Sequence, residues 1–414
     1  MTTATSALAD PLGRLDFFQR SVLANLHYWQ AWVQPRLTDS AALDPEHSLI
    51  LRALAFALDL KGQGWAASRE LIELLSPYME RRGHWDSWNQ VLGRALQVAR
   101  QLDERAGIAA LAGLSARLLA RQSRFKEANA HYRLAITTAR QIGDQVTEAR
   151  ACSNLGYYFI EQGFWRRAEV MCWHALTIFE QLDHRHGRAH TENHLGILYT
   201  RQGEWDRARR HLDRACALWQ TMDDDYGLML GYLNLGMLLN EMERFEEALG
   251  WHGKALAQAK RVGEEALLGT IQMNQGNCLR LIGRLVEAEQ RCRQAQAIFD
   301  RFKNLVGQGL VLDNLGQIYQ AQGRWPEAEA SLKSALPIWR SLNNRHHEIR
   351  TLTYLVEMGL ARQDHSLARV WLAQAEQLLT EHDSAGQYRA LWQTVAAFRQ
   401  QVDKDAFGRQ LNLT

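Results

Sequence analysis

The sequence predicts an all-α fold in which pairs of antiparallel helices stack into a solenoid. The first observation behind this prediction is a motif that recurs every 40 residues, without insertion or deletion, from about residue 85 to residue 335. Second, the 414-residue chain contains only 6 prolines, so long stretches are free to be helical. A single helical hairpin cannot bury its apolar face, and repeated hairpins therefore stack on their neighbours.

Small residues occupy fixed places in each 40-residue unit. One column comprises Gly156, Gly196, Gly236, Gly276 and Gly316, and another comprises Ala128, Ala168, Ala208, Ala248, Ala288 and Ala328. Such residues allow two helix backbones to approach closely, while larger neighbouring side chains fill the space. A column of large apolar residues comprises Trp85, Phe125, Trp165, Trp205, Phe245, Leu285 and Trp325. We interpret its tryptophans, together with Trp65, as residues that pack the turns.

Each unit is predicted to contain two helices. The first helix ends at a glycine suited to a left-handed cap, as at Gly163, Gly203, Gly283 and Gly323. Glu243 and Ser123 interrupt this column, so we expect those two turns to close differently. The second helix begins just after the aromatic residue, where Pro326 fits a first-turn position. Segments between units, such as LDHRHG (182–187), are expected to be linkers.

The period also predicts the organisation of the chain. We expect a repeat array over 69–383 with about eight units, of which the central six (about 107–346) are the most regular. Residues 1–68 are expected to form an N-terminal helical cap region with a loop between Pro35 and Pro45. Residues 384–414 are expected to form a capping helix and a tail, because a stack needs a polar outer face at its ends.

Composition excludes several classes of partner. With 48 basic and 46 acidic residues the net charge is only +2, so no strong positive electrostatic potential favours binding of nucleic acid. No apolar stretch approaches the roughly 20 residues that a membrane span needs, and no signal peptide is predicted at the N-terminus. The 5 cysteines lie in helical patterns without a CxxC pair, which indicates reduced thiols and a cytoplasmic protein.

The repeated residues resemble those of tetratricopeptide repeats. The shared pattern is Leu-Gly, then a tyrosine such as Tyr199 or Tyr319, then Gly-x-aromatic-x-x-Ala and a further alanine seven residues later. The usual period of that family is 34 residues, and the 40-residue period is similar to that of kinesin light chains and of bacterial signalling proteins. The resemblance implies a right-handed superhelical solenoid whose first helices line a concave, peptide-binding groove.

An asparagine column on the first helices is the main candidate binding site. It comprises Asn154, Asn234, Asn274 and Asn314, with His194 in the same register. Asparagine inside a helix costs roughly half a kcal/mol relative to alanine, and its amide can both donate to and accept from a peptide backbone. Alternatively, these amides bond the neighbouring helix or face water. Expected neighbours in the groove are Arg150, Asn193, Tyr157, Met237, Asn240, Asn277, Arg280, Asp313, Gln317 and Gln320.

Two sharper sites are less favoured by the pattern. Arg150 and Asn154 have the spacing of a clamp for a peptide carboxylate, but the equivalent residues of the next units do not continue it. His190 and His194 have a spacing that can bind zinc, and His184 and His186 are close in sequence. Because no matching Cys or carboxylate is evident and two of the four fall in an expected linker, we interpret them as groove and surface histidines. We expect no metal and no cofactor.

Enzyme signatures such as a Walker A sequence, HExxH and GxSxG are missing from the sequence. We therefore expect a non-enzymatic scaffold or adaptor that binds a protein or peptide, with no nucleic acid or membrane as partner. The alternative is a sensory or regulatory module that acts with a separately encoded ATPase, protease or transcription factor.

Overall fold

The computed structural model describes residues 11–37, 39–60, 62–122, 124–382 and 388–411. These residues form helices almost throughout, and no strand occurs among them. The elements in chain order are α2 (Pro11–Val33), η1 (Gln34–Arg36), α3 (Ser40–Asp59), α4 (Trp65–Arg81), α5 (Trp85–Gln101), α6 (Arg105–Arg121), α7 (Phe125–Ile142), α8 (Gln145–Glu161), α9 (Trp165–Gln181), α10 (Arg185–Gln202), α11 (Trp205–Thr221), α12 (Asp225–Glu241), α13 (Phe245–Arg261), α14 (Glu265–Leu281), α15 (Leu285–Arg301), α16 (Leu305–Ala321), α17 (Trp325–Ser341), α18 (Arg345–Ala361), α19 (His365–His382) and α20 (Arg389–Leu411).

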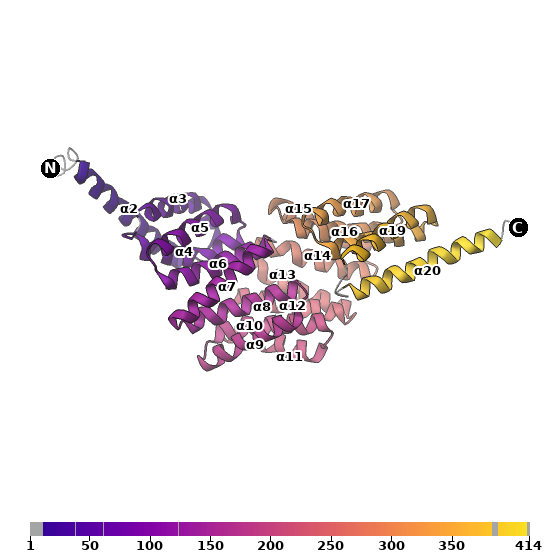
Figure 1. Cartoon of the computed structure of the whole chain (residues 1–414), viewed down its shortest axis with the longest axis horizontal. Coiled ribbons are helices and arrows are strands. Elements are labelled where there is room, and N and C mark those ends of the chain that lie inside the picture. Colours follow the sequence, from indigo (N-terminus) through magenta and orange to yellow (C-terminus); the bar gives the residue numbers. More distant parts are fainter. Residues whose placement is uncertain (1–10, 38, 61, 123, 383–387, 412–414) are drawn as a thin grey trace. The chain divides into compact units, whose positions relative to one another are not determined.

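The helices divide into two compact parts (Figure 1). The first part holds the described residues up to 242 together with 254–265, and the second holds 243–253 and the described residues from 266 onward. Helix pairs such as α8 and α9 or α10 and α11 pack against each other in the first part, as α16 and α17 do in the second. The predicted solenoid of antiparallel helix pairs is therefore confirmed. None of the described helices is long and apolar enough to cross a membrane.

A residue in the left-handed conformation closes the turns at intervals of 20 residues. At Gly203, with φ of +76°, the N–H of Glu204 donates to the carbonyl of Tyr199 at 2.9 Å, which completes a Schellman motif. The predicted caps at Gly163, Gly203, Gly283 and Gly323 are confirmed. Further glycines with positive φ are Gly83, Gly143 and Gly263.

Non-glycine residues close the other turns in the same way. These residues are Asp103, Asp183, Asp223, Glu243, Lys303, Asn343 and Gln363. The expectation that the turn at Glu243 closes differently is wrong, because its φ of +58° matches that of the glycines. The two helices joined by the turn impose this conformation, although it is unfavourable for a residue with a Cβ. Ser123 lies outside the described residues.

The expected linkers between units are short turns, and each next helix begins inside them. α10 begins at Arg185, so His186 lies in its first turn and only 182–184 of the predicted linker are outside helices. His184 caps the helix, since its Nδ1 accepts the N–H of Gly187 at 2.9 Å. Asp224 caps α12 in the same manner by accepting the N–H of Gly227 at 2.9 Å. The linker prediction is wrong because these polar side chains start a helix.

The glycine column forms close contacts between paired helices. A Cβ at Gly196 would lie 2.6 Å from the Cγ and Cδ2 of Leu212. A Cβ at Gly156 would lie 2.5 Å from the Sγ of Cys172. The same arrangement pairs Gly276 with Cys292 and Gly316 with Leu332. At these four positions the predicted close approach of helix backbones is confirmed.

The ends of the array are helical. The loop predicted between Pro35 and Pro45 is shorter than expected, because Asp39 accepts the N–H of Ala42 at 3.1 Å and starts α3 before Pro45. At the other end, α20 buries Leu391 and Val395 in the core of the second part. The domain boundaries at 68 and 383 stay predictions.

Candidate functional site

A strip of polar and apolar side chains follows the first helix of each unit, and we call it the first-helix face. It consists of the positions equivalent to Arg150, Asn154, Tyr157 and Ile160, which lie at i, i+4, i+7 and i+10 and therefore share one side of the helix. Most of its side chains are partly exposed. The position just before the asparagine is buried in every described unit from Ser153 to Thr353, so it packs between units rather than facing solvent.

In the first part of the chain, the first-helix face is occupied by internal hydrogen bonds. The Nδ2 of Asn234 donates to the Oδ1 of Asn193 at 2.8 Å, and Asn193 is only 3% exposed. His194 is also buried, its Nδ1 lies 3.0 Å from the Oγ of Ser153, and Tyr157 stacks on its ring. Burial lowers the pKa of His194 to about 4. These hydrogen bonds and ring contacts join α8, α10 and α12. They correspond to the alternative in which the amides of the asparagine column bond the neighbouring helix.

The remaining predicted residues of the first part lie along the same helices. Asn154 and Asn240 are half-buried, and Arg150 is exposed on α8. Asn234 and Met237 line a pocket of only about 10 Å³, which is too small for a ligand side chain. The carboxylate clamp of Arg150 and Asn154 stays a prediction.

In the second part, the first-helix face carries polar atoms that lack a partner. The Nδ2 of Asn274, the Nε of Arg280 and the Oε1 of Gln320 are buried, and none has a hydrogen-bond partner among the described residues. Another nitrogen of Arg280, Nη2, donates to the Oδ1 of Asn277 at 2.9 Å, and burial lowers the pKa of Arg280. Asn314 and Gln317 are half-buried on α16. This region differs chemically from the first part because its amides are not consumed between helices.

Asp313 is the most deeply buried carboxylate of this region, with 1% exposure. The Oγ1 of Thr351 donates to its Oδ1 at 2.7 Å, and a guanidinium nitrogen of Arg350 lies 3.7 Å from its Oδ2. Burial raises the pKa of Asp313 to about 7, against the opposing effect of Arg350. Asp313 therefore belongs to the buried packing position rather than to the exposed strip.

The four clustered histidines are arranged differently from the predicted zinc spacing. His190 packs on His186 and on Trp219, whereas His194 turns towards Ser153. Potential ligand atoms of His186, His190 and Asp224 lie within 4.8 Å of one another. However, the Oδ2 of Asp224 lies 3.2 Å from the Nε2 of His186 while its Oδ1 caps α12, so a helix-cap pair accounts for the cluster.

A second group of potential metal ligands consists of Glu148, Cys152 and His174. The Oε1 of Glu148 already accepts from Arg140 at 2.7 Å and lies 3.1 Å from the Nε2 of His174. Burial raises the pKa of the Cys152 thiol to about 12, so the thiolate is disfavoured. The group is therefore an internally satisfied ion-pair network.

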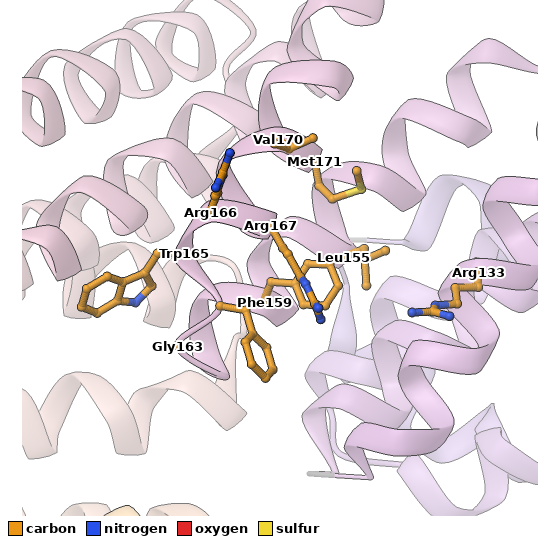
Figure 2. Close-up of a pocket in the computed structure, with 10 residues that line it drawn as sticks. Arg133, Leu155, Phe159, Gly163, Trp165, Arg166, Arg167, Val170 and Met171 are labelled. Atoms are coloured by element: carbon orange, nitrogen blue, oxygen red, sulfur yellow. The ribbon is translucent and has the colours of Figure 1, made fainter. Parts of the chain in front are cut away.

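Sequence reasoning missed a pocket of about 800 Å³ in the first part (Figure 2). It lies between α7, the end of α8, the following turn and the start of α9. Its lining residues are Arg133, Leu155, Phe159, Gly163, Phe164, Trp165, Arg166, Arg167, Val170 and Met171. Trp165 is 43% exposed, so its interpretation as a turn-packing residue is wrong. The signal was present in the repeat, because neighbouring units carry polar or small residues where this one carries Phe164 and Val170.

A repeated helical hairpin with a small-residue contact and a left-handed cap defines an α-solenoid repeat protein. A family model for the tetratricopeptide repeat matches residues 147–221, 228–301 and 308–381, which together are more than half of the chain. The chain therefore belongs to the tetratricopeptide repeat family, as the sequence resemblance indicated. None of the curated proteins compared with this sequence matches it.

Several solved structures share the fold. A Rap protein complexed with Competence and Sporulation Factor is similar with a TM-score of 0.57 and 13% identity, covering 81% of this chain and 99% of that one. Aspartyl phosphate phosphatase F from Bacillus subtilis has a TM-score of 0.54 and 10% identity, covering 86% and 94%. A signal transduction ATPase with a tetratricopeptide repeat sensor from Pyrococcus horikoshii has a TM-score of 0.53 and 13% identity. The match covers 78% of this chain and 52% of the ATPase, so this chain spans about half its length.

Proposed function

We propose that this chain is a non-enzymatic cytoplasmic scaffold whose first-helix face binds an extended segment of a partner protein. The observation that carries the proposal is the set of unpaired polar atoms on α14 and α16. Asn274 and Arg280 offer donors and Gln320 offers an acceptor, and each buried atom left unpaired costs about 1–3 kcal/mol. A peptide backbone presents both carbonyl and N–H groups at regular spacing and would satisfy them.

The charges around these atoms also favour recognition of a peptide main chain. Arg280 lies close enough to Tyr354 and Glu357 of α18 for their charges to oppose the lowering of its pKa. The charges of Arg350 and Asp313 also act on the pKa of Tyr354, in opposite directions. Because both signs of charge occur within the same region, no strongly acidic or basic ligand is favoured, and amide contacts contribute most of the selectivity.

A second candidate function is regulatory. Among the proteins of similar fold, one is a Rap protein complexed with Competence and Sporulation Factor, and another is an ATPase that uses its repeats as a sensor. If this chain works in a comparable way, the bound segment controls a separate ATPase, protease or transcription factor. Binding of the segment would then change the affinity of the chain for that effector, which distinguishes a regulator from a passive scaffold.

The test begins with selection of peptides from a random library displayed on phage, using the full chain as bait. We expect the triple variant Asn274→Ala, Asn314→Ala, Gln320→Ala to bind a selected synthetic peptide about a hundredfold more weakly, since each lost hydrogen bond contributes roughly 1 kcal/mol. Titration calorimetry measures the affinity. Thermal stability should be unchanged or higher, because alanine is the better helix former and leaves no unpaired amide.

The matched control is a triple variant at exposed and half-buried glutamines of α15, namely Gln290→Ala, Gln294→Ala and Gln296→Ala. It removes three amides from another surface, and we expect parental affinity. The packing alternative predicts the opposite result for the first triple variant, namely a lower melting temperature with unchanged peptide affinity. That result, or a library that yields no binding peptide, would overturn the proposal.

A further inference from the structure

The repeat allows each unit to serve as a reference for the others, and one unit departs from the rest at its surface. At the start of α9 stands Phe164, where the equivalent residues are Arg124, Glu204, Arg244, Arg284 and Arg324. Six residues later stands Val170, where the equivalents are Ala130, Arg210, Gly250, Gln290, Ala330 and Val370, so an exposed valine recurs only in the last unit and the combination with Phe164 is particular to this one. Phe164 is 47% exposed and Val170 is 57% exposed, so stacking of the units does not require these apolar side chains.

The charges of this unit are also changed. In four other units an arginine just before the second helix forms an ion pair with a glutamate three residues later. These pairs are Arg124–Glu127, Arg244–Glu247, Arg284–Glu287 and Arg324–Glu327. Here the pair is replaced by Phe164 and Arg167, with the guanidinium 5.3 Å from the centre of the phenyl ring. The unit thus loses a carboxylate and keeps a cation.

The outcome is an apolar pocket with a basic rim. Arg133, Arg166 and Arg167 all line it, and none forms an ion pair with a residue in the part of the chain that the structure describes. No acidic residue is among the lining residues, whose apolar members are Leu155, Phe159, Phe164, Trp165, Val170 and Met171. Figure 2 shows Arg133 reaching towards Leu155 from the side opposite the α9 residues. A volume of about 800 Å³ lies within the range of ligand sites.

We infer that this pocket docks an acidic amphipathic segment of a partner protein, in which a bulky apolar side chain is flanked by carboxylates. The apolar side chain enters between α7 and α9, and the carboxylates meet the three unpaired arginines, where bidentate pairing is available. Charge complementarity selects this partner, because a neutral or basic segment would leave the guanidinium groups unpaired next to buried apolar surface. The pocket shares no residue with the first-helix face, so the chain has a second, chemically distinct docking site and can bridge two partners.

The test uses the full chain and two synthetic 16-residue amphipathic peptides with the same central Trp and leucines, one flanked by Asp and Glu and the other by Lys. We expect saturable binding of the acidic peptide, measured by fluorescence anisotropy, and at least tenfold weaker binding of the basic one. The variant Phe164→Arg, Arg167→Glu installs the ion pair that four other units contain, so it should fold as the parent does. It should lower affinity for the acidic peptide at least tenfold.

A charge-reversal control, Arg284→Glu with Glu287→Arg, alters an equivalent surface without touching the pocket and should bind as the parent does. Circular dichroism confirms that each variant keeps its helix content. Equal affinity for the two peptides, or unchanged affinity in the Phe164→Arg, Arg167→Glu variant, would overturn the inference. Vesicles of anionic phospholipid serve as a further probe, and vesicle binding that is lost in the same variant would overturn it in favour of a lipid surface. Neither peptide result depends on Asn274, Asn314 or Gln320, so failure here is distinguishable from failure of the proposed function.

Discussion

Replacement of Gly196 by leucine should lower the free energy of unfolding by about 3 kcal/mol, since overpacking of a close contact typically costs 1–3 kcal/mol and occasionally more. Even a single Cβ at Gly196 would lie 2.6 Å from Leu212 and 3.3 Å from its backbone nitrogen. Relief requires α10 and α11 to separate, and separation disturbs the contacts that each unit makes with its neighbours. The change is measured as a shift of the helical signal in thermal and denaturant unfolding.

Three further variants isolate the cause. Gly93 also lies inside a helix, but a Cβ there would meet nothing within 4 Å. Gly93→Ala should therefore stabilise the protein by about 0.5–1 kcal/mol through helix propensity, while Gly196→Ala should destabilise it. Adding Leu212→Ala to Gly196→Leu exchanges the large and small side chains and should recover part of the loss, which a double-mutant cycle quantifies. If Gly196→Leu unfolds like the parent, the glycine column does not set the distance between the helices.

The sequence predicted this contact because the information is periodic and local. A small residue that recurs every 40 residues faces the same neighbour in each unit, so Gly156 and Gly196 could be interpreted without coordinates. The left-handed turn at Glu243 could not be predicted in this way, because the packed helices rather than the residue type impose its backbone conformation. Residue preference at a turn is a weaker influence than the spacing of the two helices that it joins.

The candidate site was less accessible to sequence reasoning for a related reason. Adjacent polar residues such as Asn193 and His194 differ by only about 100° on a helix, and the tilt of the next unit decides which of them is buried. The structure buries both, and it leaves amides such as that of Asn274 unpaired in the second part of the chain. The apolar pocket depends on Phe164, where this unit differs from the repeat. A comparison that looks for residues shared by all units does not detect such a difference.

His252 gives a large expected pH effect. It lies on α13 with 1% exposure, and neither of its ring nitrogens has a partner among the described residues. Burial lowers its pKa from 6.5 to about 4 in the folded chain. The stability of the fold is therefore unaffected by titration of this histidine above pH 6.5, where it is neutral in both the folded and the unfolded chain. As the pH falls from 6.5 towards 4, the unfolded chain binds the proton first, and the free energy of unfolding decreases. Protonation of this histidine in the unfolded chain should therefore lower the free energy of unfolding by about 2 kcal/mol between pH 7.5 and pH 5.

The variant His252→Leu should remove this loss. Leucine occupies the equivalent position at Leu212, Leu332 and Leu372, so the unit interface accommodates it. At pH 7.5 the variant should gain about 1–3 kcal/mol, because two buried unpaired nitrogens are replaced by an apolar side chain. At pH 5 the gain should be larger by about 2 kcal/mol, since the parent alone must keep this histidine uncharged. Replacement of the exposed His27 by leucine controls for loss of a histidine and should give the same small change at both pH values. Denaturant unfolding of the three proteins at pH 7.5 and pH 5 measures the difference. If the gain in free energy of unfolding of His252→Leu does not increase at pH 5, then His252 is not held neutral by burial.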